Sequence, residues 1–184
     1  MDSELKESVI QAAKLMLISA KTAPKTRGID DIEFVLLSSE NELEKVAKEM
    51  EKVGSELGKG FFARDAESVR RSNALLLIGV KASKPKDLDC GGCGYVNCEG
   101  FRKAPRKSGG GYSGPSCIFQ LIDLGIAVGS AVKTASFLNV DNRVMFSVGV
   151  AALRLGLLKN SEVALGIPLS AYGKNIYFDR KPRS

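Results

Sequence analysis

The stretch NALLLIGV, residues 73–80, restricts the fold most strongly, because it is almost continuously apolar and carries no charge. A run of this kind is typical of a strand that is buried on both of its faces. It is also well short of the roughly 20 apolar residues that cross a bilayer, as is the second uncharged run at 124–132. We therefore expect no membrane span, and a central sheet that is covered by helices.

The segments around this strand supply the covering elements. Those with apolar residues every three or four positions, or with many Ala, Gly and Ser residues, are predicted helices: 3–20, 40–58, 64–72, 117–137 and 143–157. Those rich in branched or aromatic side chains are predicted strands: 31–38, 73–80 and 161–170. This order predicts one α+β domain over residues 1–184, with a Gly-, Pro- and Lys-rich insertion at 84–117 between a strand and a helix.

Composition narrows the functional classes. Apolar residues make up 44% of the chain and charged residues 26%, which is ordinary for a folded, water-soluble protein. The net charge is +6, but the basic clusters at 102–107 and 174–183 are short and lack interleaved aromatic residues, so nucleic acid binding is not favoured. The N-terminus has no basic and apolar leader, and we expect a cytoplasmic protein.

Three of the four cysteines lie in the segment CGGCGYVNC, residues 90–98, and the fourth follows nineteen positions later. In a reducing compartment, such thiols are more often metal ligands than disulfide partners. Thiolates are the ligands of iron–sulfur clusters, and the intervening glycines permit tight turns around the sulfurs. The predicted ligands of one [4Fe-4S] cluster are Cys90, Cys93, Cys98 and Cys117.

Two other interpretations of these thiols stay open. Zinc also accepts four cysteines, although structural zinc sites usually contain two closely spaced pairs and Cys117 has no such companion. The thiols could also be unligated. The basic residues at 102–107 would offset the negative charge of a cluster, or could form a solvated loop.

The absence of histidine excludes the usual general base and the Ser-His and Cys-His nucleophile pairs. The glycines at 109–111 are not followed by the Lys and Ser or Thr of a phosphate-binding loop, and they predict a flexible linker. Asp30, Asp31 and Glu33 could form a metal patch, but solvated charge at the start of a strand is the commoner case.

The spacing of the cysteines resembles the four-iron motif of corrinoid iron–sulfur proteins and of ferredoxin-type subunits. The whole chain resembles a family of archaeal and bacterial proteins described as containing a ferredoxin domain. The segments that carry this likeness are TAPKTRGIDDIE, LDCGGCGY, GPSCIFQLIDLGIAVGSA, MFSVGVAALRLGL and GIPLSAYGKNIYFDR. The resemblance implies a cytoplasmic redox protein that passes electrons to a partner protein or to a flavin.

The order of elements also resembles the flavin-dependent nitroreductase fold. That family forms intertwined homodimers with FMN at the subunit interface, so the likeness implies a nitroreductase-like sheet and a homodimer, with the helices of 117–157 at the interface. By position, Lys25, Arg27 and Gly166 fall where the family approaches its flavin.

The chain departs from the nitroreductase pattern at the phosphate of the flavin. It lacks the Arg-Ser-x-Arg segment that holds this phosphate, and the asparagine after the Ala-Pro loop is also missing. The remaining candidate phosphate partners are Lys21, Lys174 and Arg180. An FMN-dependent oxidoreductase and a binding module with a structural four-cysteine zinc site are therefore kept as alternatives to the cluster protein, and the sequence does not decide whether the chain is an enzyme.

Overall fold

The computed structural model describes residues 3–178, and they form a mixed sheet-and-helix fold, as predicted. The main sheet has four antiparallel strands in the order β1-β2-β6-β5. Their bounds are Ile32–Leu37 for β1, Ala74–Val80 for β2, Asp141–Asn142 for β5 and Val163–Ser170 for β6. Every residue of β2 is buried, which confirms the predicted central strand.

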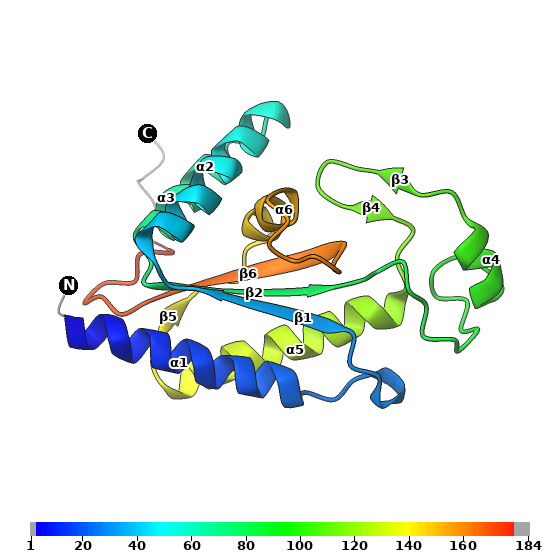
Figure 1. Ribbon diagram of the computed structural model, residues 1–184, viewed down its shortest axis with the longest axis horizontal. Helices are drawn as coiled ribbons and strands as arrows, with labels where there is room; N and C mark the ends of the chain where they lie inside the picture. Colours follow the sequence, from blue (N-terminus) through cyan, green and yellow to red (C-terminus); the bar gives the residue numbers. More distant parts are fainter. Residues whose placement is uncertain (1–2, 179–184) are drawn as a thin grey trace.

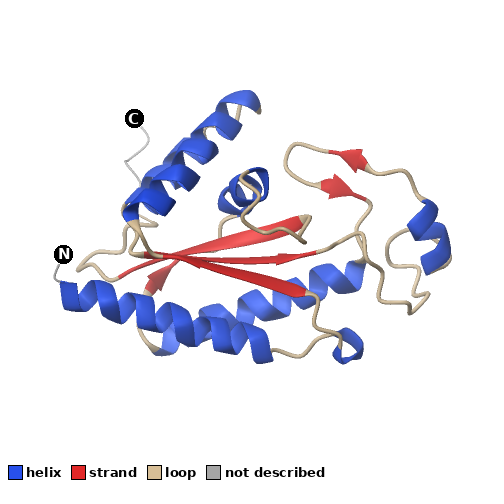
Figure 2. Ribbon diagram, viewed as in Figure 1, coloured by secondary structure: helices blue, strands red, loops and turns tan. Residues whose placement is uncertain are grey.

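Helices cover both faces of this sheet (Figures 1 and 2). The covering helices are α1 (Ser3–Thr22), α2 (Glu40–Glu56), α3 (Phe61–Arg70), α5 (Ile118–Phe137) and α6 (Phe146–Arg154). The short helix α4, Cys98–Lys103, lies beyond the end of the sheet, and a 3-10 turn, η1, follows α1 at Thr26–Gly28. Helices α1 and α5 lie under one face, while α2, α3 and α6 lie over the other.

The alternation of side chains along β2 divides the interior into two cores. Leu75 and Leu77 point to the core formed with α2, α3 and α6. Leu76 and Ile78 point to the core formed with α1 and α5. Because successive side chains of a strand point to opposite faces, a continuously apolar strand requires cover on both sides.

Local sequence explains why α2 begins where it does. Ser39 precedes the helix, and its Oγ accepts a hydrogen bond from the backbone N–H of Glu42 at 3.3 Å. The Glu42 carboxylate in turn accepts from the N–H of Ser39 at 3.1 Å. This reciprocal capping box satisfies backbone donors that a helix start otherwise leaves unpaired.

Two predictions about the chain after β2 are corrected. The glycines at 109–111 are not a free linker, because they lie in a hairpin formed by β3, Lys107–Ser108, and β4, Ser113–Gly114. A Cβ on Gly111 would come within 2.7 Å of the Phe146 ring, so the turn packs closely against α6. The predicted helix at 143–157 begins later, because Met145 pairs with β6 before α6 starts.

Within residues 3–178, α5 alone has the length and mean hydropathy of a membrane-spanning helix. One such helix is weak evidence, since the core helix of a water-soluble protein passes the same test. The inner side of α5 is buried against α1 and the sheet, where Ser19 and Thr134 hydrogen-bond between the two helices at 2.6 Å. Its outer side exposes apolar residues, among them Leu121, Ile122 and Ile126.

Candidate metal centre

The cysteine segment, residues 90–98, projects from one end of the sheet, beyond the C-terminal end of β2 (Figure 1). Cys117 directly precedes α5, and its backbone N–H donates to the carbonyl of Ala82 at 2.8 Å. This bond ties the start of α5 to the chain that leaves β2. All four cysteines are free thiols; Cys98 and Cys117 are buried, Cys93 is half-buried and Cys90 is exposed.

Glycines shape the cysteine segment and bring it against α5. Gly91 and Gly94 adopt positive φ angles of 70° and 87°, and the N–H of Gly94 donates to the carbonyl of Gly91 at 3.0 Å. Such turns favour glycine, because a Cβ disfavours this backbone region. A Cβ on Gly92 would lie 2.8 Å from Cγ2 of Ile118. The segment therefore passes directly beside the residue that follows Cys117.

Side-chain hydrogen bonds then hold the two ends of the cysteine segment together. The Asp89 carboxylate accepts a hydrogen bond from the N–H of Cys98 at 2.6 Å. Asn97 caps α4 by accepting from the N–H of Gly100 at 2.8 Å. The backbone at Cys98 is thus held next to the residue that precedes Cys90, so both ends of the cysteine segment lie together.

The chemistry of this donor set fits a thiolate-bound cluster or zinc, and the fold places the two thiol segments side by side. Among the described residues, however, no three Cys, Asp or Glu side chains are already arranged as metal ligands. Joint ligation by the four thiols requires their side chains to turn toward one another. The ligand set of Cys90, Cys93, Cys98 and Cys117 therefore stays a prediction.

The basic residues around the cysteine segment mostly pair with neighbours. Arg102 forms an ion pair with Asp87, and Lys103 pairs with Glu99 at 2.6 Å. Arg106 donates to the carbonyl of Ser113 at 2.8 Å and so secures the hairpin. These side chains are engaged locally, and exposed pairs of this kind contribute little to stability.

A set of charged and polar side chains connects the chain before the cysteine segment to α5 and to the loop after α1, and we call it the anchor network: Thr26, Arg27, Asp31, Lys86, Gln120 and Asp123. Lys86, Gln120 and Asp123 are buried, Thr26 and Asp31 are half-buried, and Arg27 is exposed. Lys86 is at the centre of the network, with a side chain that is 2% exposed. Its Nζ lies 3.0 Å from the Asp31 carboxylate and 3.1 Å from the Asp123 carboxylate, and it also donates to the carbonyl of Ile29 at 2.9 Å.

The other members connect this lysine to three separate parts of the chain. Thr26 donates to Asp123 through its N–H at 2.9 Å and its hydroxyl at 2.7 Å. Arg27 donates to the backbone carbonyl of Lys86 at 2.9 Å. Gln120 donates to Asp31 at 3.0 Å. Burial alone would raise the pKa of Asp31, but hydrogen bonds from Lys84, Lys86 and Gln120 outweigh it and lower that pKa to about 2.

The sequence pattern indicated Asp31 as solvated charge or part of a metal patch and Arg27 as a flavin contact, and it did not identify Thr26, Lys86, Gln120 or Asp123. No local pattern distinguishes Lys86 from the many exposed lysines. The one available signal was its place, four residues before Cys90.

The flavin candidates near α1 have structural partners within the chain. Lys21 forms an ion pair with Asp30. Lys25 donates to the carbonyl of Ala20 at 3.2 Å and lies 3.8 Å from the Asp30 carboxylate. Lysines in these positions satisfy carbonyl groups that the end of a helix leaves unpaired.

The remaining flavin candidates lie elsewhere. Gly166 is buried in β6, where a Cβ would come within 2.1 Å of Cγ1 of Val148, so it faces α6. Lys174 is exposed beyond the end of β6 that pairs with Ala74, whereas the loop holding Lys25 leads into the end of β1 that pairs with Val80. Arg180 lies outside the described residues. Within one chain, the described candidates therefore do not line one cleft, and their contact with a flavin stays a prediction.

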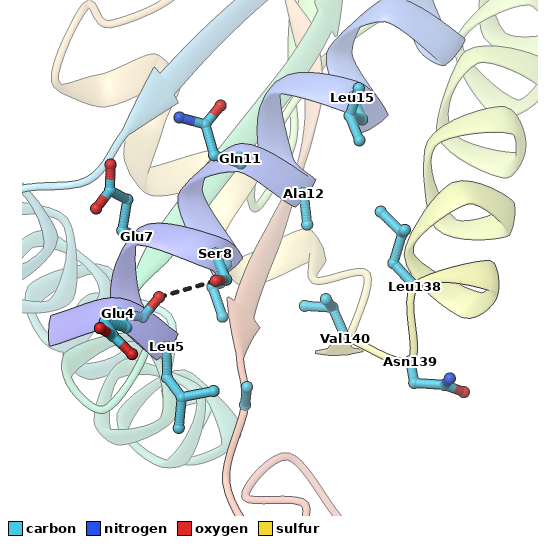
Figure 3. Close-up of a pocket in the computed structure, with 12 residues that line it drawn as sticks. Glu4, Leu5, Glu7, Ser8, Gln11, Ala12, Leu15, Leu138, Asn139 and Val140 are labelled. Atoms are coloured by element: carbon cyan, nitrogen blue, oxygen red, sulfur yellow. Dashed lines mark hydrogen bonds between the residues drawn. The ribbon is translucent and has the colours of Figure 1, made fainter. Parts of the chain in front are cut away.

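A groove of about 600 Å³ lies between α1 and the turn after α5 (Figure 3), at the opposite end of the molecule from the cysteine segment (Figure 1). Its walls are the first half of α1 and the turn after α5, with Leu15, Leu138 and Val140 inside and Glu4 and Glu7 at the rim. None of the predicted ligands or flavin contacts lines it.

Several solved structures that resemble this fold are described as nitroreductases. A nitroreductase with bound FMN from Desulfitobacterium hafniense superposes with a TM-score of 0.58 at 12% identity, covering 100% of this chain and 84% of that one. A putative NADH dehydrogenase/NAD(P)H nitroreductase from Bacteroides thetaiotaomicron gives a TM-score of 0.56 at 12% identity, covering 95% and 78%. At such low identity, the likeness establishes the nitroreductase-like fold alone.

Sequence comparison reaches further. A protein from Archaeoglobus fulgidus is 49% identical over 177 residues, which is 96% of this chain and 94% of that protein. The family described as "Uncharacterized protein containing a ferredoxin domain (DUF2148)" matches residues 113–180, a range that includes Cys117 but not the cysteine segment. The chain belongs to this ferredoxin-domain family, built on a nitroreductase-like fold.

Proposed function

We propose that the protein is a cytoplasmic electron-transfer protein that binds one [4Fe-4S] cluster through Cys90, Cys93, Cys98 and Cys117. The observation that supports the proposal is the close approach of Gly92 to Ile118, which puts the backbone of the cysteine segment beside the residue that follows Cys117. Membership of a ferredoxin-domain family supports the same function.

Each part of the chain has a role in this proposal. Cys117, held to Ala82, supplies the rigid ligand, while the glycine turns let the other three thiols approach it. Glycine also lets backbone N–H groups come close to the sulfurs, where they stabilise negative charge. When bound, such a cluster supplies one-electron redox chemistry. The exposed position of Cys90 leaves this side of the site open to a redox partner protein.

Two alternatives are kept: metal analysis tests the zinc site, and titration with FMN tests the flavin enzyme. A structural zinc site would make the protein a binding module. A flavin enzyme is less well supported, because Lys25 and Arg27 are engaged within the chain and Gly166 faces the core.

The test is anaerobic purification followed by metal and sulfide analysis. We expect about four iron and four sulfide per chain, a broad absorption near 400 nm, and loss of both in Cys117→Ser. Ser116→Ala is the matched control, since it changes the neighbouring residue without removing a thiol, and it should retain the iron. Colourless protein with one zinc per chain would replace this proposal with the binding module.

A further inference from the structure

The anchor network joins the approaches to both thiol segments. Lys86 lies four residues before Cys90, and Asp123 lies six residues after Cys117 on α5. Their ion pair at 3.1 Å is buried on both sides, with side chains 2% and 1% exposed. A buried charge that loses its partner is strongly unfavourable, so this pair resists separation of the cysteine segment from α5.

We propose that Lys86 is a positioning residue that holds the cysteine segment against the start of α5, so that its three thiols face Cys117. The loop that carries Thr26 and Arg27, which the nitroreductase likeness places near a flavin, serves this thiol site instead. The inference rests on the proposed function for its purpose, but the anchoring itself does not depend on what the thiols bind.

Two features identify Lys86 as the last firm point before the cysteine segment. Both its side chain and its backbone are held, because Arg27 donates to its carbonyl while its Nζ reaches two carboxylates. Directly after it, Asp87 and Asp89 adopt positive φ angles of 54° and 45°, so the chain bends sharply there. The direction in which the thiols leave is thus set at residue 86.

Lys84 provides a matched control on the same loop. Its Nζ also pairs with Asp31, at 2.6 Å, but its side chain is 55% exposed, and the buried carboxylate of Asp123 on α5 pairs with Lys86 instead. Lys84→Met therefore removes a lysine from the same carboxylate without releasing the cysteine segment from the helix.

The experiment compares Lys86→Met with Lys84→Met, first as metal-free protein. We expect Lys86→Met to raise the rate at which Cys98 and Cys117 react with a thiol reagent. The variant should also raise the rate of amide hydrogen exchange in residues 87–98, while the amides of β2 stay protected from exchange. In reconstituted protein, Lys86→Met should lower metal affinity by about ten-fold or more, as loss of supporting contacts typically does. Lys84→Met should match the wild type in each measurement.

A second variant separates positioning from folding. Lys86→Met combined with Asp123→Asn removes both buried charges and leaves an acceptor for Thr26, so it should fold while still exposing the thiols. Wild-type thiol reactivity and exchange in this folded variant would overturn the inference, whether or not a cluster binds. Failure of both variants to fold would also overturn it, because Lys86 would then support the whole fold. Absence of iron with the expected thiol exposure would reject only the proposed function.

Discussion

Gly166 offers a direct test of how closely α6 packs on the sheet. In the structure, a Cβ at this position would lie 2.1 Å from Cγ1 and 2.6 Å from Cβ of Val148. Carbon atoms normally approach to about 3.5–4.0 Å, so Gly166→Ala requires α6 or β6 to move by more than about 1 Å. Both elements are buried, and neither can yield into solvent.

Overpacking of this kind costs about 1–3 kcal/mol, and the severity of this overlap places the expected loss near 3 kcal/mol. For a chain of this size, that loss lowers Tm by about 6–12 °C. Urea unfolding measures it as a lower midpoint with an unchanged slope. Adding Val148→Ala should recover about 1 kcal/mol, because it removes the closest atom and leaves the Cβ contact.

Gly60→Ala is the control for this substitution. Gly60 has a φ of −59° and no atom within 4 Å of an added Cβ, so alanine should leave the stability unchanged or raise it by up to about 1 kcal/mol. Gly166→Ala with wild-type stability would refute the packing argument. It would also return Gly166 to the residues that could approach a flavin.

Three further outcomes are expected. Asp31→Asn should flatten the pH dependence of the free energy of unfolding between about pH 4 and pH 2, because hydrogen bonds outweigh burial and lower the pKa of the Asp31 carboxyl to about 2. The ionised carboxylate contributes its full stabilisation above about pH 4 and loses it as the pH falls to about 2. An unchanged acid profile in the variant would contradict this expectation. The protein should form a homodimer through the exposed apolar face of α5, and the double variant Ile122→Lys with Ile126→Lys should be a monomer in light scattering. A monomeric wild type would contradict the expected homodimer. Titration with FMN should give no sub-micromolar Kd, since Lys25 and Arg27 already bind carbonyl groups of the chain; a tighter complex would promote the flavin enzyme.

Elements with strong local patterns could be predicted from the sequence. The apolar run at 73–80 became β2, and the segment 40–58, with apolar residues every three or four positions, became α2. Both depend on interactions between residues that are near in sequence or on the side-chain period of one element. Their boundaries agree with the structure to within a few residues.

The hairpin after α4 could not be predicted in the same way. Its strands are two residues long, and it is held by contacts with distant parts of the chain, including Gly111 against Phe146 and the Tyr112 hydroxyl on the carbonyl of Ala164. A short glycine-rich stretch has no periodicity that would reveal such contacts, so the same residues suggest a linker.

Residue type and spacing were enough to predict the α+β class and the covered central strand. They also singled out the four cysteines as the candidate site, and joint ligation by these thiols stays a prediction. How the segments around those thiols are held depends on tertiary contacts. Lys86, Asp31, Gln120 and Asp123 come from three distant stretches, and the charges of Lys86, Asp31 and Asp123 become decisive only when folding removes them from water. Folding also brings Arg27 to the backbone carbonyl of Lys86 and turns Gly166 toward α6. In both cases, packing between layers, and not spacing along the chain, selects the partner of the residue.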